Sequence, residues 1–333
     1  MIPVRVRMSP ASRNNWQPTA SIEALKIRAR VLQDIRAFFA ARNVLEVETP
    51  ILSSAAVTDV QLHSFKTRYR HADVYLHTSP EFFMKRLLAA GSGDIYQVCK
   101  VFRDDELGKN HSPEFSMLEW YRLGFDQHQL MAEMEDLFNR LLQHVGVAPA
   151  ANAPVKISYQ HVFKQTLGID PLTASVADIE NTARQKNIDI PIGMEADKDM
   201  WLDWLMVAAI APSFSKDRLT FIYDYPVSQA ALARVSDVDP RVAHRFEMYF
   251  GELELANGFN ELTHAVEQRK RFEQDNQQRQ ARGVPVMPVD EYFLSALENG
   301  LPACAGVAIG LDRLLMVLLA KANINDVLSF KVE

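Results

Sequence analysis

Residues 243–259 are expected to form two strands joined by a very short turn, and this hairpin constrains the fold more than any other segment. Phe250 and Gly251 can be the central residues of a tight turn, which joins antiparallel strands. Other strand-like runs follow one another through short connections, at 44–49, 65–69, 74–77, 94–102, 114–122, 219–224 and 305–309. Together they predict an α+β fold with an antiparallel sheet flanked by helices, and not repeated βαβ units.

Apolar residues at intervals of three and four predict the helices. Ser21 is a suitable N-cap for a helix over 21–41, and Ser79-Pro80-Glu81 has the order of a cap, a first-turn proline and a first-turn acid. Further helical patterns cover 80–90, 126–145, 158–168, 176–186, 197–211, 265–281 and 311–321. We expect an N-terminal extension over 1–20 and one domain over 21–333, with a helical insertion at about 150–215.

The composition narrows the class of protein. Hydrophobic residues make up 48% and charged residues 23% of the 333 residues, which is normal for a folded soluble protein. The sequence has neither a long apolar run nor the apolar block of a signal peptide, so we expect a cytoplasmic protein without a membrane span. Cys99 and Cys304 lie far apart in unrelated contexts and predict no disulfide or thiolate site. The formal charge of −6 favours no nucleic-acid partner.

The hairpin suggests a metal site. Counting outward from a turn at Phe250-Gly251 places Glu247 opposite Glu254, with Cβ atoms about 4.5–5.5 Å apart. Two carboxylates this close repel one another unless a cation lies between them, and magnesium commonly takes one or two carboxylates together with substrate phosphates. The alternative is an exposed hairpin with both acids in water. Glu261 is an odd number of positions beyond Glu254, and an irregularity at Asn257-Gly258 would return it to the same face.

Two more clusters contain residues suited to an anionic ligand. Arg103 lies near a strand end and could hold a phosphate through its planar fork of donors. Phe115 and Tyr121 lie on the returning strand and could stack on a purine, although such residues are usually structural. At 306–313 a glycine-bearing strand end leads into a helix whose N–H groups and Arg313 could meet an anion. This pattern lacks the spacings of the common phosphate-binding loops.

Taken together, these clusters resemble the class II aminoacyl-tRNA synthetases. The strand ending at Pro50 resembles motif 1, residues 102–105 with 111–115 resemble motif 2, and Gly310-Leu311-Asp312-Arg313 resembles motif 3. Within the class, the segments 78–81, 117–121 and 257–262 are similar to the lysyl branch. The resemblance runs from about residue 16 to the C-terminus. It implies a class II catalytic domain that uses ATP and Mg²⁺ to activate the carboxylate of an amino acid.

The resemblance also implies roles on the ATP side. Arg103 would bind the α-phosphate and stabilise the charge that develops as the carboxylate attacks, and Arg313 with His111 would hold the outer phosphates. Phe115 and Arg313 would enclose the adenine, beside Gly310. The remaining ATP contacts would come from Asp104, Asp105, Ser112, Glu254 and Leu255. Glu247 and Glu254 would bind magnesium.

On the amino-acid side, Glu81 and Glu261 would each meet an amino group of the substrate. Glu119 and Tyr121 would shape the far end of the pocket, and Asn257 would donate to the carboxylate. Two buried acids that meet two ammonium groups suit a diamino acid. The remaining pocket residues would be Ser79, Pro80, Phe259 and Ala308.

The segment before the first helix bears on the acceptor. Lysyl-tRNA synthetases carry an OB-type anticodon-binding barrel before motif 1, and the roughly 20 residues here are too few for five strands. The chain is similar to the lysyl paralogues without that barrel, which ligate (R)-β-lysine to a lysine side chain of bacterial elongation factor P. We therefore expect β-lysine or lysine as the small substrate and elongation factor P as the protein partner, and we do not expect tRNA.

Ala308 bears on the choice between the two amino acids. It stands where lysyl-tRNA synthetases usually have glycine, and a methyl group that clashes with the α-amino group would disfavour lysine by about 1–3 kcal/mol. The alternative is that Ala308 only packs a strand end. Asp105, Ser112 and His264 also depart from the family pattern and bring individual contacts into question.

Two other functions remain open at this stage. One is a truncated lysyl-tRNA synthetase-like enzyme that acylates tRNA or another acceptor. The other is a non-catalytic regulatory paralogue, which would have no physical reason to keep paired acids beside paired cations. By analogy with the class, we expect a homodimer with 21–41 and Pro50 at the interface.

Overall fold

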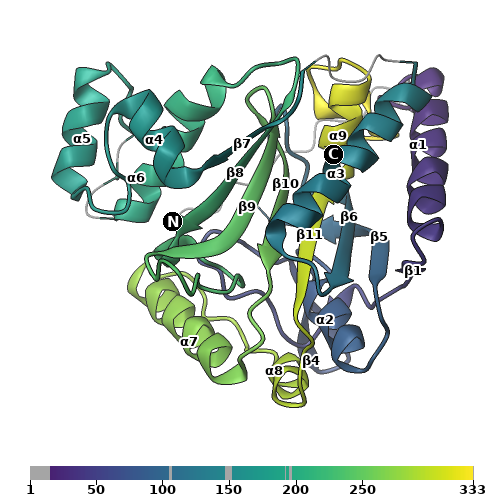
Figure 1. Ribbon diagram of the computed structural model, residues 1–333. Helices are drawn as coiled ribbons and strands as arrows, with labels where there is room; N and C mark the ends of the chain where they lie inside the picture. Colours follow the sequence, from purple (N-terminus) through teal and green to yellow (C-terminus); the bar gives the residue numbers. More distant parts are fainter. Residues whose placement is uncertain (1–15, 105–106, 147–151, 192, 195–196, 333) are drawn as a thin grey trace.

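The computed structural model describes residues 16–104, 107–146, 152–191, 193–194 and 197–332. Within these ranges an eight-stranded sheet forms the centre of the molecule (Figure 1), in the order β1-β5-β6-β11-β10-β9-β8-β7. Its strands are β1 (Leu45–Glu46), β5 (Ile95–Phe102), β6 (Glu114–Leu123), β7 (Val155–Ser158), β8 (Leu219–Pro226), β9 (Val242–Phe250), β10 (Leu253–Asn260) and β11 (Cys304–Gly310). Only the edge pairs β1·β5 and β7·β8 are parallel, so the predicted α+β fold is confirmed.

One face of the sheet is buried under three helices, α1 (Ile22–Ala40), α3 (Gln127–His144) and α9 (Leu311–Leu318). Side chains such as Leu118 and Trp120 of β6 and Val307 and Ile309 of β11 point into this core. Because successive strand residues point to opposite faces, the residues between them must point to the other side of the sheet.

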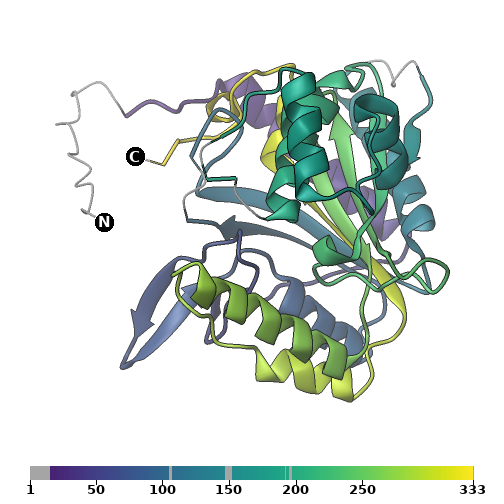
Figure 2. The ribbon, with the colours of Figure 1, turned by 90° about the vertical axis from the view of Figure 1, so that its left-hand side faces the viewer.

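Two helical groups frame this other face. Helices α4 (Tyr159–Leu167), α5 (Val176–Gln185) and α6 (Lys198–Leu205) have their own apolar core, which reaches the sheet through Ile222, Tyr225 and Tyr249. Helices α2 (Glu81–Ala89), α7 (Ala265–Ala281) and α8 (Glu291–Glu298) pack around Phe272 and Phe293. In Figure 2, α7 and α8 lie below the large sheet, and a small sheet of β2 (Leu52–Ser53), β3 (Lys66–Tyr69) and β4 (Ala72–Leu76) projects beside them.

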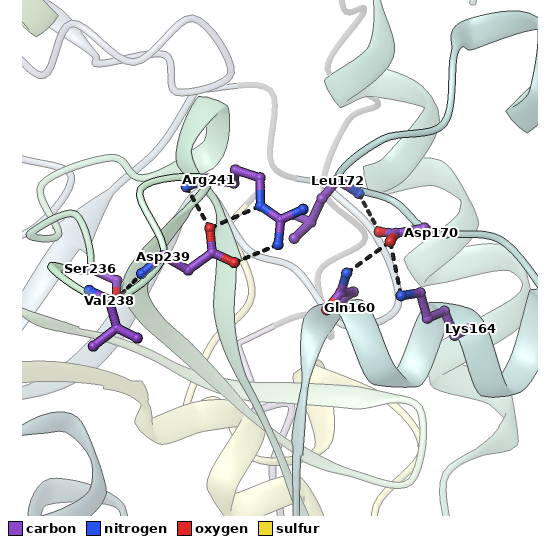
Figure 3. A network of polar contacts seen from close by, with 8 residues as sticks. All are labelled: Gln160, Lys164, Asp170, Leu172, Ser236, Val238, Asp239 and Arg241. Carbon is purple, nitrogen blue, oxygen red and sulfur yellow. Dashed lines mark hydrogen bonds and ion pairs between the residues drawn. The ribbon is translucent and has the colours of Figure 1, made fainter.

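The connection between β8 and β9 faces the first helical group. Figure 3 shows Asp239 and Arg241 on this connection opposite Asp170, which accepts hydrogen bonds from Gln160 and Lys164 of α4. Arg241 donates to both oxygens of Asp239, at 2.9 and 2.6 Å. These groups form two local networks near the surface, one on the connection and one at α4.

Most predicted elements lie where the sequence placed them, and α7 has the predicted bounds. The helix predicted over 197–211 is interrupted: α6 ends at Leu205, and a π-helical turn (Met206–Ile210) and a 3-10 turn (Ala211–Ser213) follow. The predicted strand 44–49 is regular only over Leu45–Glu46. The strands β2 and β7 and the helix α8 were not predicted. No helix in the described part of the chain has the length and apolar character needed to cross a membrane.

Candidate active site

One row of register partners crosses the open face of the sheet. It runs from β5 to β9 through Gln97, Glu119, Ala308, Asn257 and Glu247. Neighbouring strands are about 4.8 Å apart, so Glu119 and Glu247 are separated by three strand spacings, or about 14 Å. The row therefore connects a buried cluster of acids at β6, which we call the pocket because the substrate is expected there, with an acidic hairpin at β9. Ala308 and Asn257 lie between them.

The pocket at β6 contains a buried cation that the sequence interpretation did not include. The Nζ atom of Lys85 lies 2.7 Å from Glu81 Oε1 and 2.5 Å from Glu261 Oε2. The Lys85 side chain is fully buried, and the whole residue Glu261 is 2% exposed. Glu81 and Lys85 are four positions apart on α2, the spacing of neighbours on a helix surface. This spacing could have predicted the pair of Glu81 and Lys85 from the sequence. The contact of Lys85 with Glu261 depends on the fold and could not.

The third acid of the pocket, Glu119, is 2% exposed and accepts a hydrogen bond of 2.7 Å from the Tyr121 hydroxyl. Burial, and then the charge of Glu81, raises the pKa of Glu119 to about 8. Burial also raises the pKa of Glu261 to about 8, although Lys85 opposes this shift. Buried carboxyls of this kind hold protons until a cation enters, so the pocket suits ammonium groups. The structure thus brings Glu81, Glu119, Tyr121 and Glu261 together.

Gly306 forms part of the pocket wall. An added Cβ would lie 2.3 Å from Tyr121 Cε1 and 2.5 Å from Glu261 Oε1. Only glycine therefore lets the ring and the carboxylate approach the strand this closely. The sequence interpretation had linked this glycine to an anion-binding strand end, but its contacts are with the amine-binding side.

At the other end of the site, Arg313 in the first turn of α9 joins two predicted ATP-binding residues. One guanidinium nitrogen lies 2.6 Å from His111 Nε2, and another donates to the Glu254 carbonyl at 3.0 Å. The Arg103 guanidinium carbon lies 5.2 Å from the centre of the Phe115 ring, within the range of a cation–π contact. The structure therefore brings the motif 2 and motif 3 residues together.

The hairpin register differs from the prediction by one residue. Phe250 pairs with Leu253, so the turn is Gly251-Glu252 and not Phe250-Gly251. Glu254 consequently lies opposite Tyr249, and the prediction that it faces Glu247 is wrong. Since Tyr249 and Glu247 are two positions apart, all three side chains still share one face, with the acids as diagonal neighbours.

An irregularity in β10 keeps the following residues on this face. The register shifts between Glu254 and Ala256, which allows Asn257 to pair with Glu247. The sequence predicted such an irregularity at Asn257-Gly258, slightly too late. From Asn257 the even step to Glu261 keeps the last acid on the side of the pocket.

Glu247 and Glu254 can hold a divalent cation. Tyr249 donates to Glu247 Oε2 at 2.5 Å, and Arg245 donates to Glu247 Oε1 at 2.6 Å. Partial burial, and then the charge of Glu247, raises the pKa of Glu254 to about 7. Among the described residues no set of three or more His, Cys, Asp or Glu side chains could hold a metal. Two carboxylates fit magnesium when substrate phosphates complete the shell.

Arg245 is a second residue that the sequence interpretation missed. Besides Glu247 it donates to Asn257 Oδ1 at 3.2 Å and to the Gln229 carbonyl at 2.8 Å. It therefore fixes the amide of Asn257 relative to the acidic hairpin. Arg245, Glu247 and Tyr249 are two positions apart along β9. This spacing could have predicted that Arg245 lies on the same face as the two others.

The other predicted residues lie in varied surroundings. Phe259 pairs with Gly306 and Arg245 on the open face, whereas Leu255 is buried in the core under α1 and α3. Pro80 is the N-cap of α2, and Ser79 Oγ accepts from the Glu81 N–H at 3.4 Å.

On the motif 2 loop, Ser112 is buried, the Asp104 N–H donates to the His63 carbonyl, and Asp105 lies outside the described residues. At Gly310 an added Cβ would make only ordinary contacts with the Arg313 side chain, at 3.9 Å or more. The protein itself therefore does not require glycine at position 310.

The fold and the two-ended site define a class II synthetase core. The family model described as tRNA synthetases class II (D, K and N) matches residues 15–333, and the chain belongs to this family. Its relatives include proteins named elongation factor P–(R)-β-lysine ligase. Those from Pseudoalteromonas translucida and Erwinia tasmaniensis are 50% and 48% identical over 325 residues, which is 96% of this chain and 98% of each relative. The protein of that name from Avibacterium paragallinarum is 48% identical over 328 residues, 97% of this chain and 99% of the relative.

Proposed function

We propose that the protein is an ATP-dependent ligase that adenylates (R)-β-lysine and transfers it to a lysine side chain of elongation factor P. The names of relatives that match this chain over nearly its whole length support this function. The observation that carries it is the row from Glu119 to Glu247, which links a pocket for ammonium groups to a site for phosphates and a cation.

The length of the row fits the substrate. Extended lysine or β-lysine spans roughly 7–8 Å from the terminal nitrogen to the carboxyl carbon at ordinary bond lengths. With one contact of about 3 Å to Glu119, the carboxyl carbon would lie about 10–11 Å along the row, and Asn257 is two strand spacings, or about 10 Å, from Glu119. A diamino acid with its distal ammonium at Glu119 would thus present its carboxylate near Asn257, facing the α-phosphate.

In the first step a carboxylate oxygen attacks the α-phosphorus of ATP, and pyrophosphate leaves. Arg103 would hold the α-phosphate and stabilise its developing charge, while His111 and Arg313 would hold the outer phosphates. Bound magnesium at Glu247 and Glu254 would neutralise phosphate charge. In the second step the acceptor lysine amine attacks the adenylate carbonyl carbon, AMP leaves, and the new amide nitrogen loses a proton.

The preference for β-lysine over lysine is supported by the place of Ala308. It is the register partner of both Glu119 and Asn257, so its methyl group lies beside the part of the substrate that carries the α- or β-amino group. Ala308→Gly should raise the use of lysine about 10-fold or more relative to β-lysine. An unchanged ratio would mean that Ala308 serves only packing.

We also propose that the protein works in the cytoplasm as a homodimer through α1 and the segment that follows it. Leu45, Ile51 and Leu52 expose 54%, 39% and 46% of their surface in the single chain, which an interface would cover. Light scattering coupled to size-exclusion chromatography tests this state, and a monomer at micromolar concentration would contradict it.

The activity is tested by magnesium-dependent pyrophosphate exchange with β-lysine and lysine, together with the intact mass of elongation factor P after incubation. We expect faster exchange with β-lysine and a mass increase of one β-lysyl group. Exchange without any mass increase, combined with labelling of tRNA, would replace this function by tRNA acylation. Absence of exchange with either amino acid would favour a non-catalytic protein.

A further inference from the structure

The buried ammonium group of Lys85 lies between two carboxylates to which the proposed function assigns the amino groups of the substrate. It bridges Glu81, on its own helix, and Glu261, which follows β10. The pocket proposed to bind the ammonium groups of the substrate therefore already contains one ammonium group of the protein itself. Lysine is almost never fully buried unless it is paired.

Several neighbours of Lys85 are apolar. Its neighbours in sequence on the buried stripe of α2 are Met84 and Leu88, and its Nζ lies 5.8 Å from the centre of the Phe293 ring. In such a place hydrophobic residues that replaced the whole group of Lys85 and its two acids would be neutral or stabilising. The fold alone thus gives no reason for a charge at this position.

The charges of the pocket balance only with two further cations. The acids Glu81, Glu119 and Glu261 carry three negative charges when ionised, and Lys85 carries one positive charge. Tyr121 on β6 and Cys304 on β11 lie close to these acids and are neutral at their ordinary protonation. A ligand with two ammonium groups would bring the total charge to zero.

Lys85 keeps its charge in the folded protein. Burial opposes the charge, but the attraction of Glu261 and Glu81 outweighs it and raises the pKa of Lys85 above its ordinary value. The ammonium is therefore a fixed part of the pocket at all pH values at which the protein is used. It also holds the two carboxylates at one separation, because it contacts an oxygen of each.

We propose that Lys85 is a positioning and specificity-determining residue that anchors the carboxyl groups of Glu81 and Glu261 through its two ion pairs and sets the pocket charge to match a diamino acid. This inference deepens the proposed function and rests on it for the assignment of these acids to the substrate. Without Lys85 the two acids lose their common cation and repel one another. The pocket then provides fewer ionic partners for the ligand. This weakens the binding of a ligand with two ammonium groups more than the binding of a ligand with one.

The test compares two ligands in the full-length protein. β-Lysine and 3-aminohexanoic acid share a carbon chain and a β-amino group, and only β-lysine has the distal amine. Lys85→Met replaces the ammonium by an uncharged group of similar length. We expect the ratio of kcat/KM for β-lysine to that for 3-aminohexanoic acid, measured by pyrophosphate exchange, to fall 10-fold or more, with the KM for ATP unchanged.

The matched control is Lys164→Met, which removes a lysine that also forms an ion pair of 2.9 Å, with Asp170, but lies 49% exposed in the insertion (Figure 3). It should leave both the ratio and the KM for ATP unchanged. Lys85→Gln provides a second uncharged variant that can hydrogen-bond both acids, and it should lower the ratio as Lys85→Met does.

The outcomes separate the inference from the function. If wild-type protein activates neither β-lysine nor lysine, the proposed function fails. If wild type prefers β-lysine but folded Lys85 variants lose activity toward both ligands equally, or keep the wild-type ratio, Lys85 serves structure and the inference is wrong. If neither Lys85 variant folds, the ammonium is needed for stability, and the inference is wrong as well.

Discussion

Arg28 on α1 forms an ion pair of 2.5 Å with Asp312, the residue immediately before Arg313 on α9. The other Asp312 oxygen accepts from the Ser116 N–H at 2.7 Å, and Arg28 also donates to the Ser116 hydroxyl at 2.7 Å. Asp312 is 1% exposed. The helix proposed for the dimer interface is thereby connected to the start of the helix that carries a proposed phosphate-binding arginine.

Arg28→Met should therefore weaken ATP binding without direct contact with ATP. It leaves a buried carboxylate without its ionic partner, which destabilises a protein by about 3–5 kcal/mol, and it frees the first turn of α9. We expect the KM for ATP to rise about 10-fold and the KM for β-lysine to stay within twofold. Arg30→Met is the control, because Arg30 forms an exposed pair with Glu23 at 3.3 Å. Equal effects of the two substitutions would contradict this role.

The affinity for β-lysine should increase with pH. Glu119 and Glu261 have pKa values raised to about 8, chiefly by burial. Below that pH the free carboxyls hold protons, which an arriving ammonium group must displace. We expect the Kd to fall as the pH rises from about 6.5 to about 8.5, and protons to be released on binding at lower pH. Calorimetry in two buffers of different ionisation enthalpy measures this release, and its absence would refute the prediction.

The same acids should make the free protein less stable as the pH rises. In the unfolded chain they ionise near 4.5, whereas in the folded protein they keep protons up to about 8. The folded state binds more protons between these values, so the free energy of unfolding falls as the pH rises through this window. Glu119→Gln removes one of the two contributions. Urea unfolding should show a shallower pH dependence for this variant, and an identical slope would contradict the prediction.

Gly306→Ala should damage the amine pocket. Its methyl group would meet Tyr121 and Glu261 at distances that real side chains do not adopt, and such overpacking destabilises by about 1–3 kcal/mol. We expect a lower melting temperature and a KM for β-lysine raised about 10-fold or more. Gly310→Ala is the comparison, because its methyl group has room in the protein. It should leave the melting temperature unchanged and raise only the KM for ATP, if adenine lies there as proposed.

Glu254→Ala should raise the magnesium concentration that supports half-maximal pyrophosphate exchange by about 10-fold or more, because one of two carboxylate ligands is lost. Magnesium titrations of both proteins measure this shift, and a chelator should abolish exchange in the wild type. Glu252→Ala is a control in the neighbouring turn, outside the paired residues of the hairpin. A magnesium requirement unchanged by Glu254→Ala would place the cation elsewhere.

Sequence periodicity predicted the long helices well, because their caps and apolar stripes are local. The predicted position of the hairpin turn was wrong by one residue, because both Phe250-Gly251 and Gly251-Glu252 can form a two-residue turn. The position of the glycine distinguishes the two turns. Gly251 is the first central residue of the observed turn and has a φ of 56°, and type II′ turns place glycine at this position. The shared face of Glu247 and Glu254 survived this error because Tyr249, the true partner of Glu254, is two positions from Glu247, and the bulge in β10 then brings Asn257 to the same face.

The contacts that complete the site were less accessible from the sequence. Lys85 meets Glu261, and Arg28 meets Asp312, through partners far apart in the chain. Their positions depend on how α2 packs against the end of β10 and how α1 packs against α9. Single-chain patterns record which face of a helix is buried, but not which charged group lies opposite.

If the substrate lies along the row across the sheet as proposed, the row would also measure the length of the substrate. Its two ends are fixed by hydrogen-bonded strands whose spacing of about 4.8 Å cannot adapt, whereas each methylene changes the length of an amino acid by only about 1.3 Å. Ornithine would leave a gap at one end, and homolysine would be compressed. On this proposal the backbone, and not only the side chains in the pocket, would select the chain length of the amino acid.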